Sequence, residues 1–366
     1  MIQESVGLYY FNVAIIFILV LISFRSLYYG RWVRNTNNNK NNTVYYAANF
    51  ILILLFVIFQ FTETDFWGYL QIFYRKGELV EPVQEYIKNL FDNFFVWRAF
   101  VWGGAFLIYL FVFKRLGLNM RFYFPLFVLC YLSRFISREQ LGIAIMFFGS
   151  TYLVRPFKIK SLSYVLGILL IMGSYYFHSS MIVSIAMLIP AIIRVNAKRA
   201  VLVLALFIPL ISLFTFVLGD DSLMSVFEDS STNMMDRISI YTEQVTDKMN
   251  INGLIRQLIF WSPMVLMLWD IIVRSSHKNS VVALPAYISY YLSYWLYLFV
   301  ISFVFYWVST SSFISVRFLD KTLFPMVIVL SYWYEIQRPN KTMKISLLLF
   351  LLYLAFSYSL TIYKAS

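Results

Sequence analysis

Long runs of apolar residues, separated by shorter polar stretches, recur from one end of the chain to the other. Most runs suit a helix that crosses a bilayer, because about 20 apolar residues span the hydrocarbon core. The pattern predicts an all-α polytopic membrane protein with about 12 transmembrane helices, forming a single transmembrane domain over residues 1–366. The expected spans are residues 8–24, 44–62, 94–113, 122–137, 139–154, 162–177, 180–194, 200–218, 255–273, 284–307, 318–336 and 344–362.

The polar stretches between these runs fall into two classes that differ in charge. The loops that follow the odd-numbered spans (the first, third, fifth and so on) hold more than half of the 30 lysine and arginine residues. Nearly all of the 18 acidic residues lie in the other class. By the positive-inside rule, the basic loops are cytoplasmic and both termini lie outside. The net charge of +12 follows from this topology, so it does not indicate a nucleic-acid partner.

Two of the expected external segments are long, at about residues 63–93 and 219–254. Both mix acidic, polar and aromatic residues, whereas the cytoplasmic loops are short and plain. Loops held by a rigid scaffold often carry function. We therefore expect recognition or chemistry on the external face.

Composition agrees with the membrane assignment and excludes several kinds of site. The chain of 366 residues is 61% hydrophobic and only 13% charged, about half the usual charged share. Its mean hydropathy is +0.72. Cys130 is the only cysteine, so an internal disulfide is impossible. No nucleotide-binding fingerprint and no metal-ligand spacing is present, and we expect no cofactor and no metal.

Charged side chains at membrane depth are costly and therefore point to function. Here they gather near the external ends of several spans. They are Arg98, Arg134, Arg138, Glu139, His178, Arg256, Arg317 and Asp320. Charge through the whole depth of the bilayer would favour a transporter, and this one-sided distribution favours an external site.

The stretch SRFISREQLG, residues 133–142, places Arg134 and Arg138 four residues apart between two apolar runs. On a helix this spacing puts both on one face. Two guanidinium groups suit a phosphate or pyrophosphate, since each planar fork donates to two oxygens. The alternatives are that they reach toward lipid headgroups or pair with Glu139. The role of Glu139 itself stays open. Gly142 and Gly149, just beyond, are expected to permit close helix packing.

His178, in YYFHSS, is the only histidine expected on the external side. An imidazole can act as a general base near neutral pH, although a histidine here could instead cap its helix. Asp65 and Tyr69, in TDFWGY, are of the types that bind a sugar by hydrogen bonding and stacking. The competing interpretation of Asp65 is a helix N-cap.

Three further residues are candidates for substrate binding. Arg237 and Tyr241 lie one helical turn apart in the second external segment, where a surface amphipathic helix is the alternative. Arg317 suits an anion contact, but it could also cap a helix or pair with Asp320.

The order of these motifs resembles the EpsG family of Wzy-like bacterial polysaccharide polymerases. The resemblance covers about residues 5–335. The motifs that carry it read TDFWGY, SREQLGIAIMFFGSTYL, YYFHSSMIV and SVRFLDKTLFP. The sequence departs from the family pattern at two points. Family members often carry a basic residue shortly before the aspartate, where this chain has Thr62 and Glu63, and Glu139 separates Arg138 from Gln140. The equivalences of Asp65, Arg138 and His178 are therefore preferred to finer ones.

The resemblance implies a membrane glycosyltransferase with a glycosyltransferase C-like fold in the bacterial inner (cytoplasmic) membrane. Such proteins transfer a growing glycan from undecaprenyl diphosphate to an incoming lipid-linked repeat unit on the external face, alongside membrane lipid and a chain-length regulator. In this interpretation His178 is the base, Asp65 binds or activates the acceptor, and Arg138 and Arg317 contact the pyrophosphate, assisted by Arg134 or Arg237. Arg98, Tyr69 and Tyr241 would bind substrate. The alternatives are a lipid-linked oligosaccharide flippase or transporter and an O-antigen ligase-like transferase.

Overall fold

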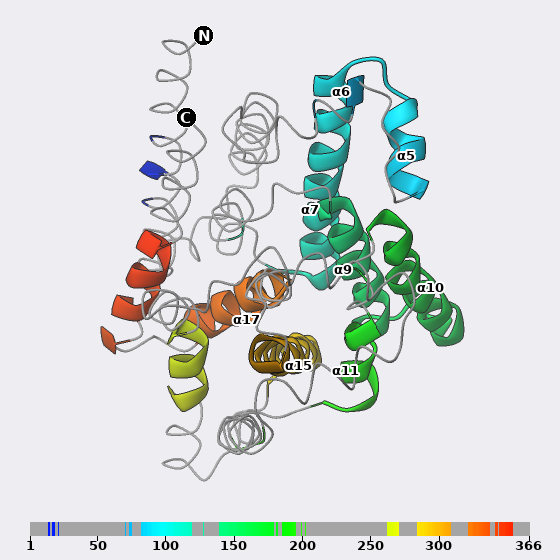
Figure 1. Cartoon of the computed structure of the whole chain (residues 1–366). Helices are drawn as coiled ribbons and strands as arrows, with labels where there is room; N and C mark the ends of the chain where they lie inside the picture. The colour runs from blue at the N-terminus through cyan, green and yellow to red at the C-terminus, as the bar shows by residue number, and fades with distance from the viewer. Residues whose placement is uncertain are drawn as a thin grey trace, which may run out of the picture. The chain divides into compact units, whose positions relative to one another are not determined.

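Every regular element in the part of the chain that the structure describes is a helix (Figure 1). The structure is a computed structural model, and it describes residues 82–118, 139–178, 185–194, 262–270, 284–308, 321–336 and 344–353, with isolated positions elsewhere. The chain divides into two compact units. The first comprises Met1–Ala191 and Ser331–Ser366, and the second comprises Ile192–Leu330.

The first unit begins, in its described part, with the short helix α5 (Pro82–Asn89) and then a long helical stretch. That stretch is built from α6 (Phe94–Arg98), the π-helical turn η1 (Ala99–Gly103) and α7 (Gly104–Leu116). Asn93 starts it, because its side chain accepts hydrogen bonds from the backbone N–H groups of the next turn. Gly117 ends it in the left-handed conformation, with φ 63°, which glycine adopts without steric cost.

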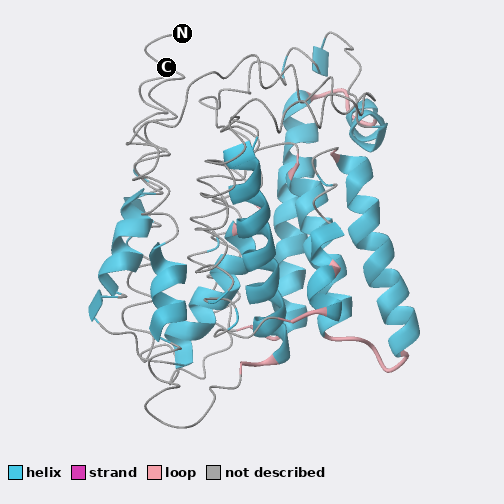
Figure 2. Ribbon diagram, turned by 60° about the horizontal axis from the view of Figure 1, so that its bottom comes forward, coloured by secondary structure: helices cyan, strands magenta, loops and turns pink. Residues whose placement is uncertain are grey.

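Helices α9 (Gln140–Val154) and α10 (Lys160–Gly173) pack against each other, and α9 also contacts α7 (Figure 1). A Cβ atom on Gly149 would lie 2.9 Å from the carbonyl oxygen of Gly167, and one on Gly167 would lie 3.0 Å from that of Gly149. The two backbones therefore meet directly, which confirms the close packing expected at Gly149. Figure 2 shows the long helices of this unit running roughly parallel to one another.

Aromatic rings fill the space between these helices. The ring of Phe127 lies 5.0 to 5.9 Å from those of Phe106, Tyr109 and Phe113, all fully buried. Such ring contacts add to the stabilisation that burial of the apolar area provides. The core of this unit is thus densely packed with rings around the middle of α7. Polar side chains buried in it need hydrogen-bond partners, because water does not reach them.

Several of the expected spans are confirmed as helices. Residues Phe94–Leu116 and Lys160–Phe177 form the two described helical stretches that are long and apolar enough to cross a membrane. Helix α9 is shorter and also apolar, as expected for 139–154. The expected span at 180–194 is different, because its described part holds a 3-10 turn and the four-residue α11 (Ile189–Ile192). Pro190 lacks the N–H that a continuous α-helix would use.

The second unit contains α15 (Ala286–Val308) and the start of α17 (Leu323–Ile336). These agree with the spans expected at 284–307 and 318–336. The rings of Tyr291 and Phe324 meet edge to face, with centroids 6.4 Å apart. The hydroxyl of Tyr297 donates to the carbonyl oxygen of Ile193 over 3.0 Å. Helical residues are also described at 262–270 and, in the first unit, at 344–353.

Candidate functional site

His178 follows η2 (Ser174–Phe177), a 3-10 helix of one turn that continues α10. Its backbone is extended, with φ −163° and ψ 134°, so the helix stops at this residue. Its N–H still donates to the carbonyl oxygen of Tyr175 over 3.2 Å, and its own carbonyl accepts from Met181 over 2.9 Å. The histidine therefore ends a helix, as one sequence interpretation had it, but its side chain turns inward and is only 6% exposed.

Glu139 supplies the carboxylate that faces this imidazole. It precedes α9, and its carbonyl oxygen accepts the N–H of Ile143 over 2.9 Å. Its Oε1 lies 3.7 Å from Nδ1 of His178, and its side chain is 11% exposed. That separation exceeds an ordinary hydrogen bond but suits an ion pair when the imidazole is protonated. Glu139 is also the one acidic residue between positions 93 and 219, so this long apolar region contains a single carboxylate.

Close backbone packing brings the two side chains together. A Cβ atom on Gly142 would lie 3.1 Å from Cβ of Phe177 and 3.2 Å from the carbonyl oxygen of Ser174. The first turn of α9 therefore rests on η2, immediately before His178. This confirms the close packing expected at Gly142 and explains why a residue at the start of α9 reaches a residue at the end of η2.

A buried hydrogen bond anchors the same turn of α9 to α7. The hydroxyl of Tyr109 donates to Oε1 of Gln140 over 3.3 Å, and both residues are almost completely buried. A buried polar pair of this kind is costly to break, because the group left behind loses its partner without regaining water. Gln140 thereby fixes the start of α9, and with it the backbone that carries Glu139.

Arg98 lies at the junction of α6 and η1 and is 1% exposed. Its guanidinium carbon lies 5.3 Å from the ring centroid of Trp102, a cation–π distance. Trp102 in turn meets Trp97 edge to face, and Phe73 and Phe94 complete this aromatic group. The structure thus buries Arg98 among aromatic rings, at a π-helical turn, a feature that often marks functional positions.

Helix α5 lies beside the histidine segment, because it contacts η2. Its Lys88 is buried and forms an ion pair with Glu85, Nζ to Oε1, at 2.8 Å. The first expected external segment, residues 63–93, therefore contains a helix that packs against the turn leading into His178.

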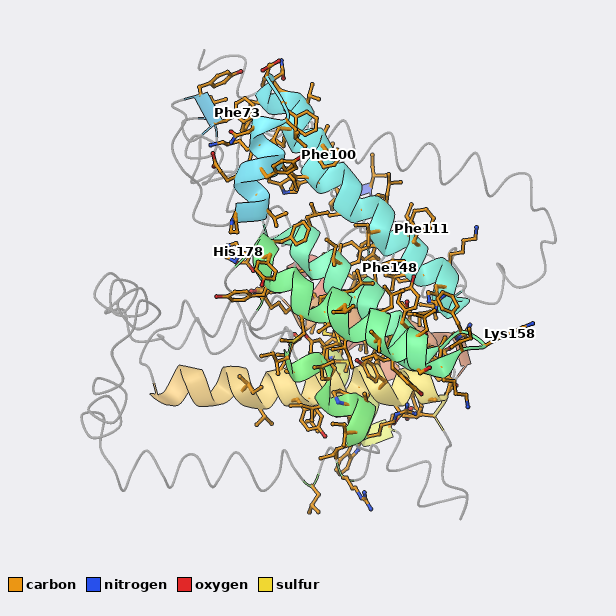
Figure 3. All side chains as sticks on the ribbon, turned by 90° about the vertical axis from the view of Figure 1, so that its right-hand side faces the viewer. Phe73, Phe100, Phe111, Phe148, Lys158 and His178 are labelled. Atoms are coloured by element: carbon orange, nitrogen blue, oxygen red, sulfur yellow. The ribbon has the colours of Figure 1, made fainter. Side chains whose placement is uncertain are left out.

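The histidine and the basic loop that holds Lys158 lie at opposite ends of α10. The stretch Lys160–Phe177 has 18 residues, and a helix of that length is about 27 Å long. That is close to the thickness of the hydrocarbon core of a bilayer. Figure 3 shows His178 at one end of the α9–α10 pair and Lys158 at the other. The positively charged lysines at the start of α10 and the His178–Glu139 pair at its end are thus separated by the full length of a membrane span.

A model of the EpsG family matches residues 43–366, which is most of the sequence. The chain belongs to the EpsG family. The match confirms the resemblance seen in the sequence, and this family comprises Wzy-like polysaccharide polymerase or glycosyltransferase membrane proteins. No curated protein and no solved structure matches the chain.

EpsG-family membership and the two long apolar helices are consistent with a membrane protein that takes part in polysaccharide biosynthesis. Of the site residues predicted from the sequence, the structure describes His178 and Arg98. The others lie outside the described residues, namely Asp65, Tyr69, Arg134, Arg138, Arg237, Tyr241 and Arg317.

The structure adds three polar residues to the candidate site: Glu139 beside His178, and Gln140 with Tyr109 behind it. The sequence showed that Glu139 is a charge at membrane depth. It did not show the partner, because the contact joins two segments that are distant along the chain.

Proposed function

We propose that this EpsG-family protein is a Wzy-type polysaccharide polymerase. In this proposal it transfers a growing glycan from undecaprenyl diphosphate to an incoming undecaprenyl-diphosphate-linked repeat unit. The observation that carries the proposal is the buried pair of His178 and Glu139, with 3.7 Å between Nδ1 and Oε1, in a family of polymerase-like membrane proteins. An imidazole held by a carboxylate is suited to accept a proton from a sugar hydroxyl.

The reaction needs one bond to form, one to break and one proton to move. The acceptor hydroxyl oxygen attacks the anomeric carbon of the donor sugar, and the bond from that carbon to the diphosphate oxygen breaks. The hydroxyl proton passes to His178, and we assign it to Nε2 because Nδ1 faces the carboxylate. Glu139 then stabilises the imidazolium that forms, as a carboxylate behind a catalytic histidine does in other enzymes. Glu139 is therefore a positioning residue.

The leaving lipid diphosphate needs positive charge, which preorganised donors supply best. Arg138 precedes Glu139 in the chain, so it is the first candidate, and Arg317 is the second. Arg134 or Arg237 would assist them. We assign the acceptor sugar to Asp65 and Tyr69, with Tyr241 and Arg98 as further substrate-binding residues.

The proposed topology follows from the charge pattern. The chain would be a multi-pass protein of about 12 spans in the bacterial inner membrane, with a glycosyltransferase C-like fold and its site on the external face. The position of His178 at the opposite end of α10 from Lys160 supports this orientation. A separate protein that regulates chain length is a proposed partner.

The test is the length of the glycan that cells make when the gene is replaced by a variant. His178→Ala and Arg138→Ala should each leave the protein in the membrane and remove long chains, while single repeat units still reach their final acceptor. Lys341→Ala, at an exposed lysine in the same unit, is the matched control and should give normal chains.

Three other outcomes would overturn the proposal. Full-length polymer from both variants would remove the site assignment. Loss of single repeat units from the outer surface would indicate a flippase instead. Long chains that remain on the lipid carrier would indicate a ligase-like transferase.

A further inference from the structure

Two arginines are held together at the end of α9 and α7 remote from His178. The Arg115 guanidinium carbon lies 4.1 Å from the ring centroid of Tyr152 and 4.4 Å from that of Phe157. Its Nη2 donates to the carbonyl oxygen of Arg155 over 2.9 Å, and Nη1 of Arg155 donates to the carbonyl oxygen of Arg115 over 3.5 Å. These reciprocal contacts fix the positions of two basic side chains at the same end of α7 and α9.

The backbone at Gly117 leaves room for the Arg155 side chain. Gly117 has φ 63°, and a Cβ atom there would lie 2.9 Å from Nη1 of Arg155. Any other residue would be strained in this conformation and would also push the guanidinium away. Ser163 fixes the other side of the loop, since its hydroxyl donates to the carbonyl oxygen of Tyr152 and accepts the N–H of Phe157.

More basic residues lie next to the pair along the chain, and the sequence of these helices is free of carboxylates. Lys114, Lys158 and Lys160 flank the two arginines, whereas residues 93–138 and 140–219 contain no aspartate or glutamate. The negative end of the α7 dipole accounts for Lys114 and Arg115. Lys160 is different, because it begins α10, where the dipole is positive, and Ile159 provides no side-chain cap there. An anion is favoured at such a position.

An exposed apolar surface continues from the basic cluster along α10. Leu162, Val165 and Leu169 are 57%, 54% and 63% exposed, and Ile159 and Phe157 join them at the loop. The combined surface is amphiphilic, with cations at one end and aliphatic side chains beyond. A free phosphate ion would use only the first part, whereas a phospholipid would use both.

We propose that Arg115, Arg155, Lys158 and Lys160 form a binding site for the phosphate headgroup of an anionic phospholipid, whose acyl chains lie along α10. Basic clusters on the cytoplasmic side of membrane helices bind such headgroups in other proteins. The proposal rests on the membrane embedding that is part of the proposed function, but not on the glycosyl transfer. The two can therefore fail separately.

The experiment measures lipid retention by the purified full-length protein. Phosphatidylglycerol and phosphatidylcholine with the same acyl chains are added at equal concentration in detergent, and bound lipid is counted by native mass spectrometry. We expect preferential retention of phosphatidylglycerol. Arg155→Gln should weaken it about fivefold, the effect of removing one charge near an anionic headgroup, with phosphatidylcholine unchanged. Lys341→Gln, which removes an exposed charge elsewhere, should have no effect.

Arg155→Gln removes the charge and keeps a polar side chain at this exposed position. If it still disturbs the fold, as judged by elution, the double variant Lys158→Gln/Lys160→Gln replaces it, because both lysines are exposed. Equal retention of the two lipids by the parent protein, or an unchanged preference in the variant tested, would overturn the proposal. Displacement of phosphatidylglycerol by millimolar inorganic phosphate would show a phosphate-ion site instead. His178→Ala should bind phosphatidylglycerol normally, which separates this site from the proposed polymerase site.

Discussion

Replacing Glu139 by glutamine tests the role assigned to the imidazole–carboxylate pair. Nδ1 and Oε1 lie 3.7 Å apart, and both side chains are buried. With an effective dielectric constant of about 20, a carboxylate and an imidazolium at that separation attract by about 4.5 kcal/mol. The dipole of the glutamine amide retains part of this attraction for the imidazolium. We therefore expect a loss of about 2–3 kcal/mol in the transition state, which lowers the rate about 30- to 160-fold.

The assay uses lipid-linked repeat units purified from cells that lack the gene, and follows the first transfer at several pH values. The rate of Glu139→Gln should fall as stated, and the acid limb of its pH profile should move to lower pH. The direction follows because removing the negative charge favours the neutral imidazole, which is the form that accepts a proton. Asp92→Asn is the matched control, since Asp92 is an exposed carboxylate ahead of α6 and its removal is expected to matter little.

Two results would refute this reasoning. A rate for Glu139→Gln within twofold of the parent protein would show that the carboxylate does not assist the transfer. A slow rate with an unmoved acid limb would assign Glu139 a structural role only, and His178 would lose its support as the base.

Two further predictions concern the packing that holds the site, and both are measured as the apparent melting temperature in detergent. Gly149→Ala should destabilise by about 1–3 kcal/mol, because the new Cβ would meet a backbone carbonyl at 2.9 Å. At Gly104 an added Cβ atom would meet no neighbour within 4 Å, so Gly104→Ala should instead stabilise the protein slightly. Equal changes in melting temperature for the two variants would contradict the packing argument. Tyr109→Phe should cost about 1–3 kcal/mol by leaving Gln140 with an unmatched buried oxygen, while Tyr164→Phe, at an exposed tyrosine, should be neutral.

Hydropathy alone predicted most of the described helices. Residues 94–113, 139–154 and 162–177 are continuous apolar runs, and each is a helix whose limits differ from the prediction by a few residues. The pattern failed at 180–194, where the run is equally apolar but the described residues form short turns. Apolar composition reports burial or membrane depth, and it does not report where the backbone leaves the helix. The helix end just before His178 was placed correctly at 177, whereas the breaks inside 180–194 were not foreseen.

The site was only partly predictable for a related reason. His178 could be selected as a rare ionisable residue in an apolar run, and that selection needs no knowledge of the fold. The partnership with Glu139 depends on which helix faces which. Helix α9 is apolar on every side, so no periodicity indicates its orientation. The sequence therefore left the role of Glu139 open, with a pair to one of the arginines as one alternative, and the structure shows its carboxylate beside His178.

The glycines of α9 connect these observations. Gly142 and Gly149 are seven residues apart, which is about two turns, so they lie on one face of the helix. Gly142 rests on η2 and Gly149 rests on Gly167 of α10. That face therefore sets the distance between the two helices along most of their length. The distance from Glu139 to His178 is fixed at one end of the same contact, because Glu139 precedes Gly142 by less than one turn. The small residues that permit tight helix packing are thus also what brings a carboxylate against an imidazole in an otherwise apolar region.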